Sequence, residues 1–205
     1  LAHYADAAVD IEFDFPFGFK ELEGIHSRTD FDLKRHEAHS GKKLRYFDPE
    51  TREKYVPYVV ETAIGVDRLF LAHLCNAYQE EEAPTADGGT ATRLVLRLHP
   101  LVAPTKVAIF PLVKKDGLPD AARKIFKELS LEFQCLYDDK DSIGRRYRRQ
   151  DARGTPYCVT VDEDTLTDEL VTVRDRDTMQ QERVPVDKLR ENLRKKLDIR
   201  QLIEA

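Results

Sequence analysis

Residues 55–74 hold charged side chains at spacings that suit a ligand carrying both signs of charge. An apolar, β-branched run at residues 55–60 is typical of a buried strand. Glu61 follows it, then the pair Asp67 and Arg68, and then apolar residues at helical spacing. An acid and a guanidinium held on rigid elements are suited to recognising a zwitterion. The alternative is that Glu61 and Arg68 form only a structural ion pair.

Two further carboxylates, Glu21 and Glu23, lie two residues apart in a segment expected to be a strand. On a regular strand both would face the same side of the sheet. Carboxylates on one face repel each other unless a cation lies between them, and magnesium carried by a nucleotide would supply that cation. The alternative is a strand whose outer face is simply solvated.

These residues belong to a region, residues 1–100, that is expected to form an antiparallel sheet with helices against it. Residues 10–17 alternate acidic and apolar side chains, as a half-buried strand does. Residues 79–93 are acidic and then rich in Pro, Gly, Thr and Ala, which predicts a loop or linker. The other expected elements are a strand at 19–25, a helix at 30–40, a hairpin or loop at 42–54 and a strand at 92–98.

A second domain is expected at residues 104–205, after a boundary near 100–104. Strands and helices alternate along it, which is typical of a three-layer α/β/α domain. A turn at 175–177 predicts an antiparallel hairpin at one edge, so the sheet should be mixed and the fold class of the chain α/β (α+β). The expected strands are 106–111, 133–137, 157–161 and 170–175, and residues 183–185 are expected to start a last segment. The expected helices are 119–129, 143–152 and 186–197.

Composition narrows the class of protein. The chain has 205 residues, 41% of them apolar and 35% charged, which allows a real core and a well-solvated surface. No apolar run is long enough to cross a bilayer. Its three cysteines are far apart in sequence, which argues against a disulfide framework or a zinc site and fits the cytoplasm. Because the chain lacks an initiator Met and starts within patterned sequence, we expect a fragment of a longer protein.

Several stretches resemble a known family. Residues 55–74, YVPYVVETAIGVDRLFLAHL, resemble motif 3 of the class II aminoacyl-tRNA synthetases. Residues 18–48, GFKELEGIHSRTDFDLKRHEAHSGKKLRYFD, resemble a block of the glycyl-tRNA synthetases, and the match runs from residue 2 to about 78. Residues 103–112, 141–151 and 154–162 resemble the anticodon-binding domain shared by the glycine, histidine, proline and threonine synthetases.

The resemblance implies a role for each matched residue. Glu21 would be the partner of the magnesium ion that ATP carries, and Arg68 would lie over the adenine. Arg28 would lie near the carboxylate of glycine, and Glu61 would hold its ammonium group. The implied ATP contacts are Glu21, Leu22, Gly65, Val66, Asp67 and Arg68, and the implied glycine contacts are Arg28, Glu61, Thr62, Ala63, Ile64 and Gly65.

One departure from the family affects the glycine site. The family commonly has Glu-Pro-Ser where this chain has Glu61-Thr62-Ala63. The serine hydroxyl expected to touch the substrate is therefore missing at Ala63. Thr62 offers a hydroxyl, but its side chain should point elsewhere.

Four arginines interrupted by a tyrosine occupy residues 145–149. Arginine and tyrosine together can pair with phosphates and stack on unpaired bases, as anticodon recognition requires. Because this segment is expected to be helical, not all of its arginines can face RNA. Arg148 and Arg149 are assigned to tRNA, and the alternative is that some of the arginines brace Asp151 or other acids.

The resemblance implies that the parent protein is a glycine–tRNA ligase, a cytoplasmic homodimer. It would use ATP with Mg²⁺ to form glycyl-adenylate and transfer glycine to tRNA(Gly), with no tightly bound cofactor or resident metal. Motifs 1 and 2 of class II enzymes are not found in this chain, so no catalytic residue is assigned. The chain alone is expected to be inactive. The alternative function is a non-catalytic accessory subunit that binds nucleic acid.

Overall fold

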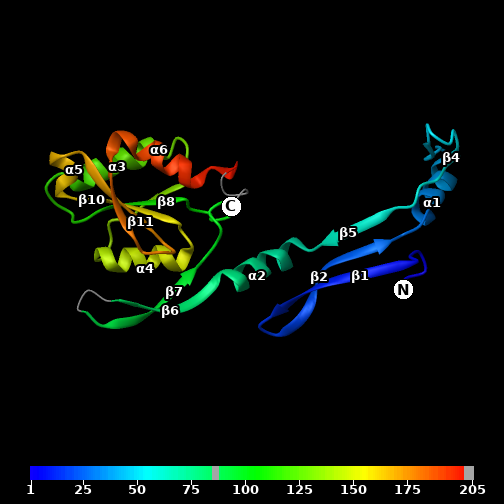
Figure 1. Cartoon of the computed structure of the whole chain (residues 1–205), viewed down its shortest axis with the longest axis horizontal. Coiled ribbons are helices and arrows are strands. Elements are labelled where there is room, and N and C mark those ends of the chain that lie inside the picture. Colours follow the sequence, from blue (N-terminus) through cyan, green and yellow to red (C-terminus); the bar gives the residue numbers. More distant parts are fainter. Residues whose placement is uncertain (85–87, 201–205) are drawn as a thin grey trace. The chain divides into compact units, whose positions relative to one another are not determined.

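The computed structural model describes residues 1–84 and 88–200. The chain divides into two compact units, Leu1–Cys75 and Asn76–Ala205, and each is described here by itself. Figure 1 labels their helices and strands. None of the helices in the described ranges is long and apolar enough to cross a membrane.

The first unit is built on a three-stranded antiparallel sheet in the order β1-β2-β5, as expected from the sequence (Figure 1). The expected helix at 30–40 and the expected hairpin at 42–54 are both present. The elements of this unit are β1 (Ala7–Phe15), β2 (Gly18–Ser27), α1 (Phe31–Ser40), β3 (Tyr46–Phe47), β4 (Lys54–Tyr55), β5 (Val60–Ile64) and the start of α2 (Val66–Ala77).

A β-bulge interrupts the pairing of β1 with β2. Ile11 pairs with Glu23 and Glu12 pairs with Glu21, so the residue between the two glutamates has no partner. A bulge shifts the alternation of side chains by one residue. A Cβ atom on Gly24 would lie 3.6 Å from Oε1 of Glu21, so Glu21 shares a face with Gly24 and not with Glu23. The prediction that both glutamates face the same side is therefore wrong.

The strand expected at residues 55–60 lies further along the chain. Tyr55 pairs with Tyr46 in the small β3–β4 hairpin, and the large sheet is rejoined only at Val60, which pairs with Ser27. Pro57 lies between these two pairings and has no N–H to donate to a ladder. Glu61 is consequently inside β5 and not beyond the end of a strand.

The second unit contains a five-stranded mixed sheet in the order β12-β11-β10-β8-β9. The three strands β9, β8 and β10 are parallel, whereas β11 and β12 form the expected antiparallel hairpin at one edge. The expected α/β class with a mixed sheet is confirmed. The strands are β8 (Val107–Pro111), β9 (Cys135–Tyr137), β10 (Tyr157–Val161), β11 (Leu170–Asp175) and β12 (Gln181–Pro185).

Helices cover both faces of this sheet, which gives three layers (Figure 1). One face buries Ile109 and Val159 against α3 and α6 in the main apolar core. The other face buries Phe110 against Tyr147 of α4, with ring centroids 5.7 Å apart. A short helix that the sequence did not predict, α5, begins at a capping box formed by Asp162 and Thr165. The helices are α3 (Leu118–Leu129), α4 (Ile143–Arg153), α5 (Glu163–Thr167) and α6 (Val186–Leu197).

The segment 79–93 is mostly a β-hairpin and not a linker. Strand β6 (Tyr78–Pro84) pairs antiparallel with β7 (Thr90–Leu96), and residues 85–87 lie outside the described part of the chain. The hairpin belongs to the second unit, so the compact units divide earlier than the expected boundary at 100–104. The polar composition of this segment suggested an exposed linker. That inference failed because the hairpin buries a charged residue, Arg93, as fully as it buries Val95.

Candidate functional site

A hollow of about 550 Å³ lies where β2, β5 and the start of α2 meet. All six residues that the resemblance implies for ATP line it, and so do three of those implied for glycine, since Gly65 belongs to both sets. The lining residues are Glu21, Leu22, Ala63, Ile64, Gly65, Val66, Asp67 and Arg68. The binding of ATP there stays a prediction, but residues far apart in sequence do share one hollow.

The first turn of α2 holds one side of this hollow. The N–H of Leu69 donates to the carbonyl oxygen of Gly65 over 2.8 Å, so the helix starts directly after β5. Arg68 projects from this turn and donates through Nη1 to the backbone carbonyl of Glu21. That bond ties α2 to β2 and leaves further guanidinium donors of Arg68 for a ligand.

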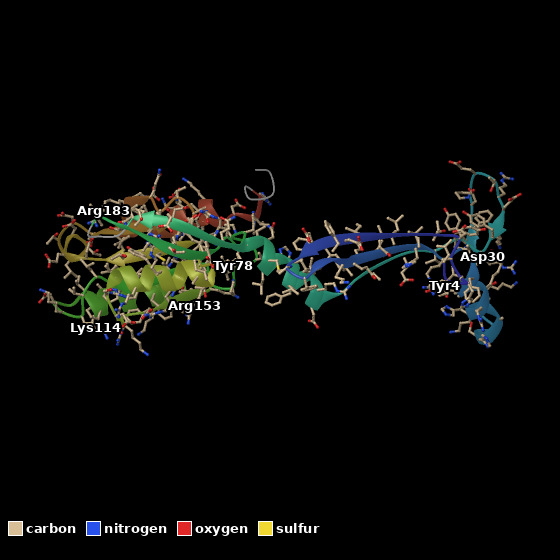
Figure 2. The ribbon with its side chains drawn as sticks, turned by 90° about the horizontal axis from the view of Figure 1, so that it is seen from below. Tyr4, Asp30, Tyr78, Lys114, Arg153 and Arg183 are labelled. Carbon is tan, nitrogen blue, oxygen red and sulfur yellow. The ribbon has the colours of Figure 1, made fainter. Side chains whose placement is uncertain are left out.

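Arg28, just beyond the end of β2, is enclosed by two carboxylates and an aromatic ring. Its Nε donates to Asp32 over 2.5 Å and its Nη2 donates to the same carboxylate over 3.1 Å. Its Nη1 donates to Glu61 on β5. Its Cζ atom lies 4.1 Å from the ring centroid of Tyr4. Tyr4 and Asp30, both labelled in Figure 2, mark this end of the first unit.

These contacts favour the charged forms of Arg28 and Asp32. Hydrogen bonding to Asp32 raises the pKa of Arg28, and Glu61 adds to this effect. Hydrogen bonding to Arg28 lowers the pKa of Asp32 below its usual value. At neutral pH Arg28 and Asp32 therefore carry opposite charges.

Glu61 and Arg68 do not form the structural ion pair that was the alternative interpretation. The guanidinium that meets Glu61 belongs to Arg28, whereas Arg68 meets the carbonyl of Glu21. The contact between Arg28 and Glu61 brings together the two residues implied for the two ends of glycine.

Small residues lie between the charged groups of this sheet face. Gly24 pairs with Ala63 across β2 and β5, next to the pair of His26 with Glu61. A Cβ atom on Gly24 would lie 3.0 Å from Cε1 of His26, which is too close without a shift. Gly24 therefore cannot carry a side chain unless His26 moves.

Thr62 does not stand in for the missing serine hydroxyl. It pairs with Ile25, whereas its neighbours Glu61 and Ala63 pair with His26 and Gly24. Because side chains alternate along a strand, the Thr62 side chain faces away from Glu61.

Sequence reasoning missed two members of this cluster, Asp32 and Tyr4. Asp32 lies four residues after Arg28, which is the spacing at which opposite charges pair on a helix. That spacing was an available signal. Nothing local indicated Tyr4, because its contact depends on where the N-terminal segment folds.

The arginines of α4 have different environments. Arg146 is buried and donates to the backbone carbonyls of Pro111 and Leu112 over 2.6 and 3.0 Å. Arg149 is ion-paired with Asp138 and Asp141, at 2.6 and 2.5 Å. These two arginines brace the domain.

The other two arginines of residues 145–149 are less engaged. Arg148, assigned to tRNA from the sequence, is half-buried, and its one hydrogen bond to the described residues goes to the carbonyl of Pro84 over 3.5 Å. The side chain of Arg145, which sequence reasoning did not single out, is 78% exposed, and its contact with Asp141 is long at 4.0 Å. Among residues 145–149, Arg148 and Arg145 are the better-placed cations for a phosphate backbone.

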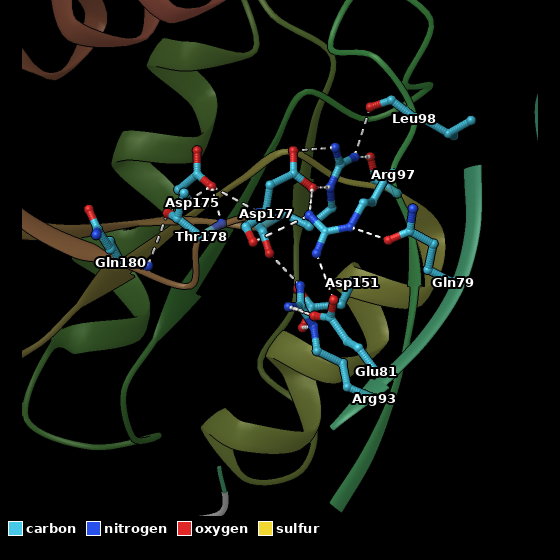
Figure 3. A network of polar contacts seen from close by, with 12 residues as sticks. Gln79, Glu81, Arg93, Arg97, Leu98, Asp151, Asp175, Asp177, Thr178 and Gln180 are labelled. Atoms are coloured by element: carbon cyan, nitrogen blue, oxygen red, sulfur yellow. Dashed lines mark hydrogen bonds and ion pairs between the residues drawn. The ribbon is translucent and has the colours of Figure 1, made fainter. Parts of the chain in front are cut away.

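Asp151 is braced, but not by the arginines of its own helix. It accepts from Arg93 over 2.9 Å and from Arg174 over 2.8 and 3.2 Å (Figure 3). These residues belong to a larger network that fastens the β6–β7 hairpin to the mixed sheet, which we call the arginine clasp. The clasp consists of Glu81, Arg93, Arg97, Asp151, Arg174, Arg176 and Asp177.

Both units have matches among known proteins. A family model described as an anticodon binding domain matches residues 106–196. A glycine–tRNA ligase of Borrelia hermsii is 54% identical over 191 residues, which is 92% of this chain and 42% of that protein. The chain is a relative of the glycine–tRNA ligases. Other relatives with the same name are one of Staphylococcus aureus strain Newman, 56% identical over 189 residues, and one of Caldanaerobacter subterraneus, 54% identical over 197 residues.

The similarity to glycine–tRNA ligases extends through both compact units. It covers 92% of this chain and 40% of the Staphylococcus aureus protein, and 96% and 41% for Caldanaerobacter subterraneus. The chain thus spans about two fifths of the length of these relatives. The resemblance inferred from the sequence is confirmed.

Proposed function

We propose that this chain supplies part of a glycine–tRNA ligase. Its first unit would contribute to the glycine and ATP sites, and its second unit would bind the anticodon region of tRNA(Gly). The observation that supports this best is the hollow in which all six implied ATP residues converge. As in the family that the sequence resembles, the ligase is proposed to be a cytoplasmic homodimer.

In the proposed reaction the carboxylate of glycine attacks the α-phosphate of ATP. Glycyl-adenylate forms, pyrophosphate leaves, and glycine then passes to the 3′-terminal ribose of tRNA. Such chemistry depends on positioning and on cations near the spreading negative charge. Arg68 would stack on the adenine, and Glu21 would meet the magnesium ion that ATP carries.

Glycine would be held by charge at both ends and selected by size. Arg28 would bind its carboxylate and Glu61 its ammonium group. The residues that follow Glu61 would form the wall that excludes a larger amino-acid side chain.

A chimera tests the proposal. In it, this chain replaces the matching segment of the Staphylococcus aureus relative. We expect glycine-dependent ATP–pyrophosphate exchange and charging of tRNA(Gly), both lost when Glu61→Gln removes the negative charge at the ammonium site. The isolated chain is expected to show no exchange. An inactive chimera that is folded would refute the proposal.

The second candidate is a non-catalytic subunit that binds nucleic acid. Ala63, at the position where the family commonly has serine, is the observation in its favour. An inactive chimera, together with tRNA binding by the isolated chain, would support this candidate instead.

The tRNA contact can be tested separately on the isolated chain. Replacing Arg148 with alanine should weaken binding of tRNA(Gly) severalfold and reduce the salt dependence of binding by about one counterion. The matched control is Arg190→Ala on α6, on the opposite face of the sheet, which should leave affinity unchanged. Equal losses in both variants would show that α4 has no special role in RNA binding.

A further inference from the structure

The guanidinium of Arg28 is held on two sides by groups other than Glu61. Asp32 occupies two of its donors, at Nε and Nη2, and Tyr4 covers one of its faces. A fork-to-fork contact of this kind fixes the plane of the guanidinium as well as its place. The remaining donor edge, at Nη1, therefore faces Glu61.

Arg28 and Glu61 neutralise each other directly when no ligand lies between them. A zwitterion offers one anionic and one cationic group, so it can replace this contact with two contacts, one to each residue. Such an exchange requires that Arg28 stays in place when its bond to Glu61 is broken. Asp32 meets that requirement because it binds the opposite edge of the same guanidinium.

We propose that Asp32 is a positioning residue for glycine, which binds by inserting between Arg28 and Glu61 while Asp32 and Tyr4 hold the guanidinium still. The inference rests on the proposed function, and it gives Asp32 a role in glycine binding although Asp32 does not touch the glycine. The pKa of Asp32 is lowered by Arg28, so its carboxylate is ionised at neutral pH, as this role requires.

The test is Asp32→Asn in the chimera. The amide keeps the size of the side chain but cannot form the charged two-point contact. We expect the KM for glycine in pyrophosphate exchange to rise about tenfold, because Arg28 is no longer fixed. The KM for ATP should stay within about twofold, and Asp32→Glu should recover part of the loss.

The matched control is Asp30→Asn. Asp30 lies two residues away and also forms an i,i+4 pair, with Lys34 at 2.6 Å, but among the described polar contacts of Arg28 none is to Asp30. This variant should leave both KM values unchanged. If Asp32→Asn raises both KM values equally, or neither, the inference is overturned.

A second measurement uses the 205-residue chain by itself and does not depend on enzymatic activity. The Arg28 Nε–H signal in NMR should exchange slowly with solvent in the unsubstituted chain and in Asp30→Asn, and quickly in Asp32→Asn. Equal exchange in all three would overturn the inference even if activity changed. If the unsubstituted chimera lacks glycine-dependent exchange, the proposed function fails and the glycine role of Asp32 fails with it. An active chimera unaffected by Asp32→Asn overturns the inference alone.

Discussion

Asp151 is a carboxylate with no exposed surface, and two arginines share it. Removing one member of such a group leaves buried charge without compensation, which costs about 3–5 kcal/mol. We predict that Asp151→Ala lowers the free energy of unfolding of the second unit by about this amount, as measured by denaturant titration.

The control for this prediction is Glu191→Gln. Glu191 also forms an ion pair, with Lys195 at 3.1 Å, but both side chains are mostly exposed. Solvent screens such pairs, so the substitution should leave stability unchanged within error. Similar losses in the two variants would contradict the importance of burial at Asp151.

The cysteines give a prediction about pH. Burial raises the pKa of Cys135 to about 11, and it raises the pKa of Cys158 as well. Both thiols should therefore alkylate slowly at pH 8, and Cys135 should react faster only as the pH approaches 11. Mass spectrometry after timed iodoacetamide treatment measures this, with the unfolded chain as the reference.

The same shift has a consequence for stability. A thiol whose pKa is higher in the folded state stabilises that state fully below the unfolded pKa, and the contribution is lost as the pH rises towards the folded value. Labelling of Cys158 in the native chain as fast as in the unfolded chain would contradict its burial.

Sequence reasoning at this scale worked where a residue type sits in a distinctive run. Glu21, Gly65 and Arg68 were named from the family resemblance of the runs around them, and they line one hollow, whereas their contact with ATP stays a prediction. The contact of Arg28 with Glu61 was beyond reach, because it joins residues 33 apart through the register of two strands.

Element boundaries depend on single residues that interrupt a pattern. The α4 helix ends at Gly154, whose φ is +79°, and a Cβ there would lie 2.7 Å from Cδ1 of Leu98. We predict that Gly154→Ala destabilises the second unit by about 1–3 kcal/mol, from backbone strain and steric overlap. Thermal unfolding measures the change.

Gly144, near the start of the same helix, is the matched control. A Cβ at this position meets no atom within 4 Å. Because alanine is the better helix former, Gly144→Ala should leave stability unchanged or raise it by about 0.5 kcal/mol. A loss similar to that of Gly154→Ala would mean that helix composition, and not the close approach to Leu98, sets the cost.

The elements that the sequence predicted are those with a plain hydrophobic period. The α3 helix, with Ala122, Ile125 and Leu129 on one face, is an example. Strand β7 lies where a strand was expected at 92–98, but its partner β6 escaped prediction because buried ion pairs, which have no periodic signature, hold the hairpin to the sheet. The β1–β2 bulge escaped because pairing partners decide it, and a single strand does not reveal them.

The β6–β7 hairpin determines where a stable fragment of the second unit must begin. Arg93 of the hairpin forms a buried ion pair with Asp151 of α4. Arg176 donates to the carbonyl of Leu98, which follows the hairpin, over 2.9 Å. We predict that a fragment of residues 76–205 unfolds cooperatively, whereas a fragment of residues 104–205 is unfolded or aggregates because Asp151 and Arg176 lose these partners. Circular dichroism during heating distinguishes the two, and equal stability would restore the boundary at 100–104.

The arginine clasp responds differently to acid and to base. Partial burial opposes the ionisation of Asp177, but Arg176 and Arg97 outweigh it and lower the pKa of Asp177. Its contribution to stability is therefore present above the unfolded pKa and is lost as the pH falls through the lowered folded value. Guanidiniums keep their protons in alkaline solution, so the clasp loosens from the acid side alone.

The cations of the clasp are all arginines, and that choice has a chemical consequence. Acetyl donors and amine-directed cross-linkers modify lysine, and within the described residues the clasp contains none. Heavy acylation of the chain would thus neutralise its exposed lysines while leaving the fastening of the hairpin intact. The surface of this unit can change its charge without the unit coming apart.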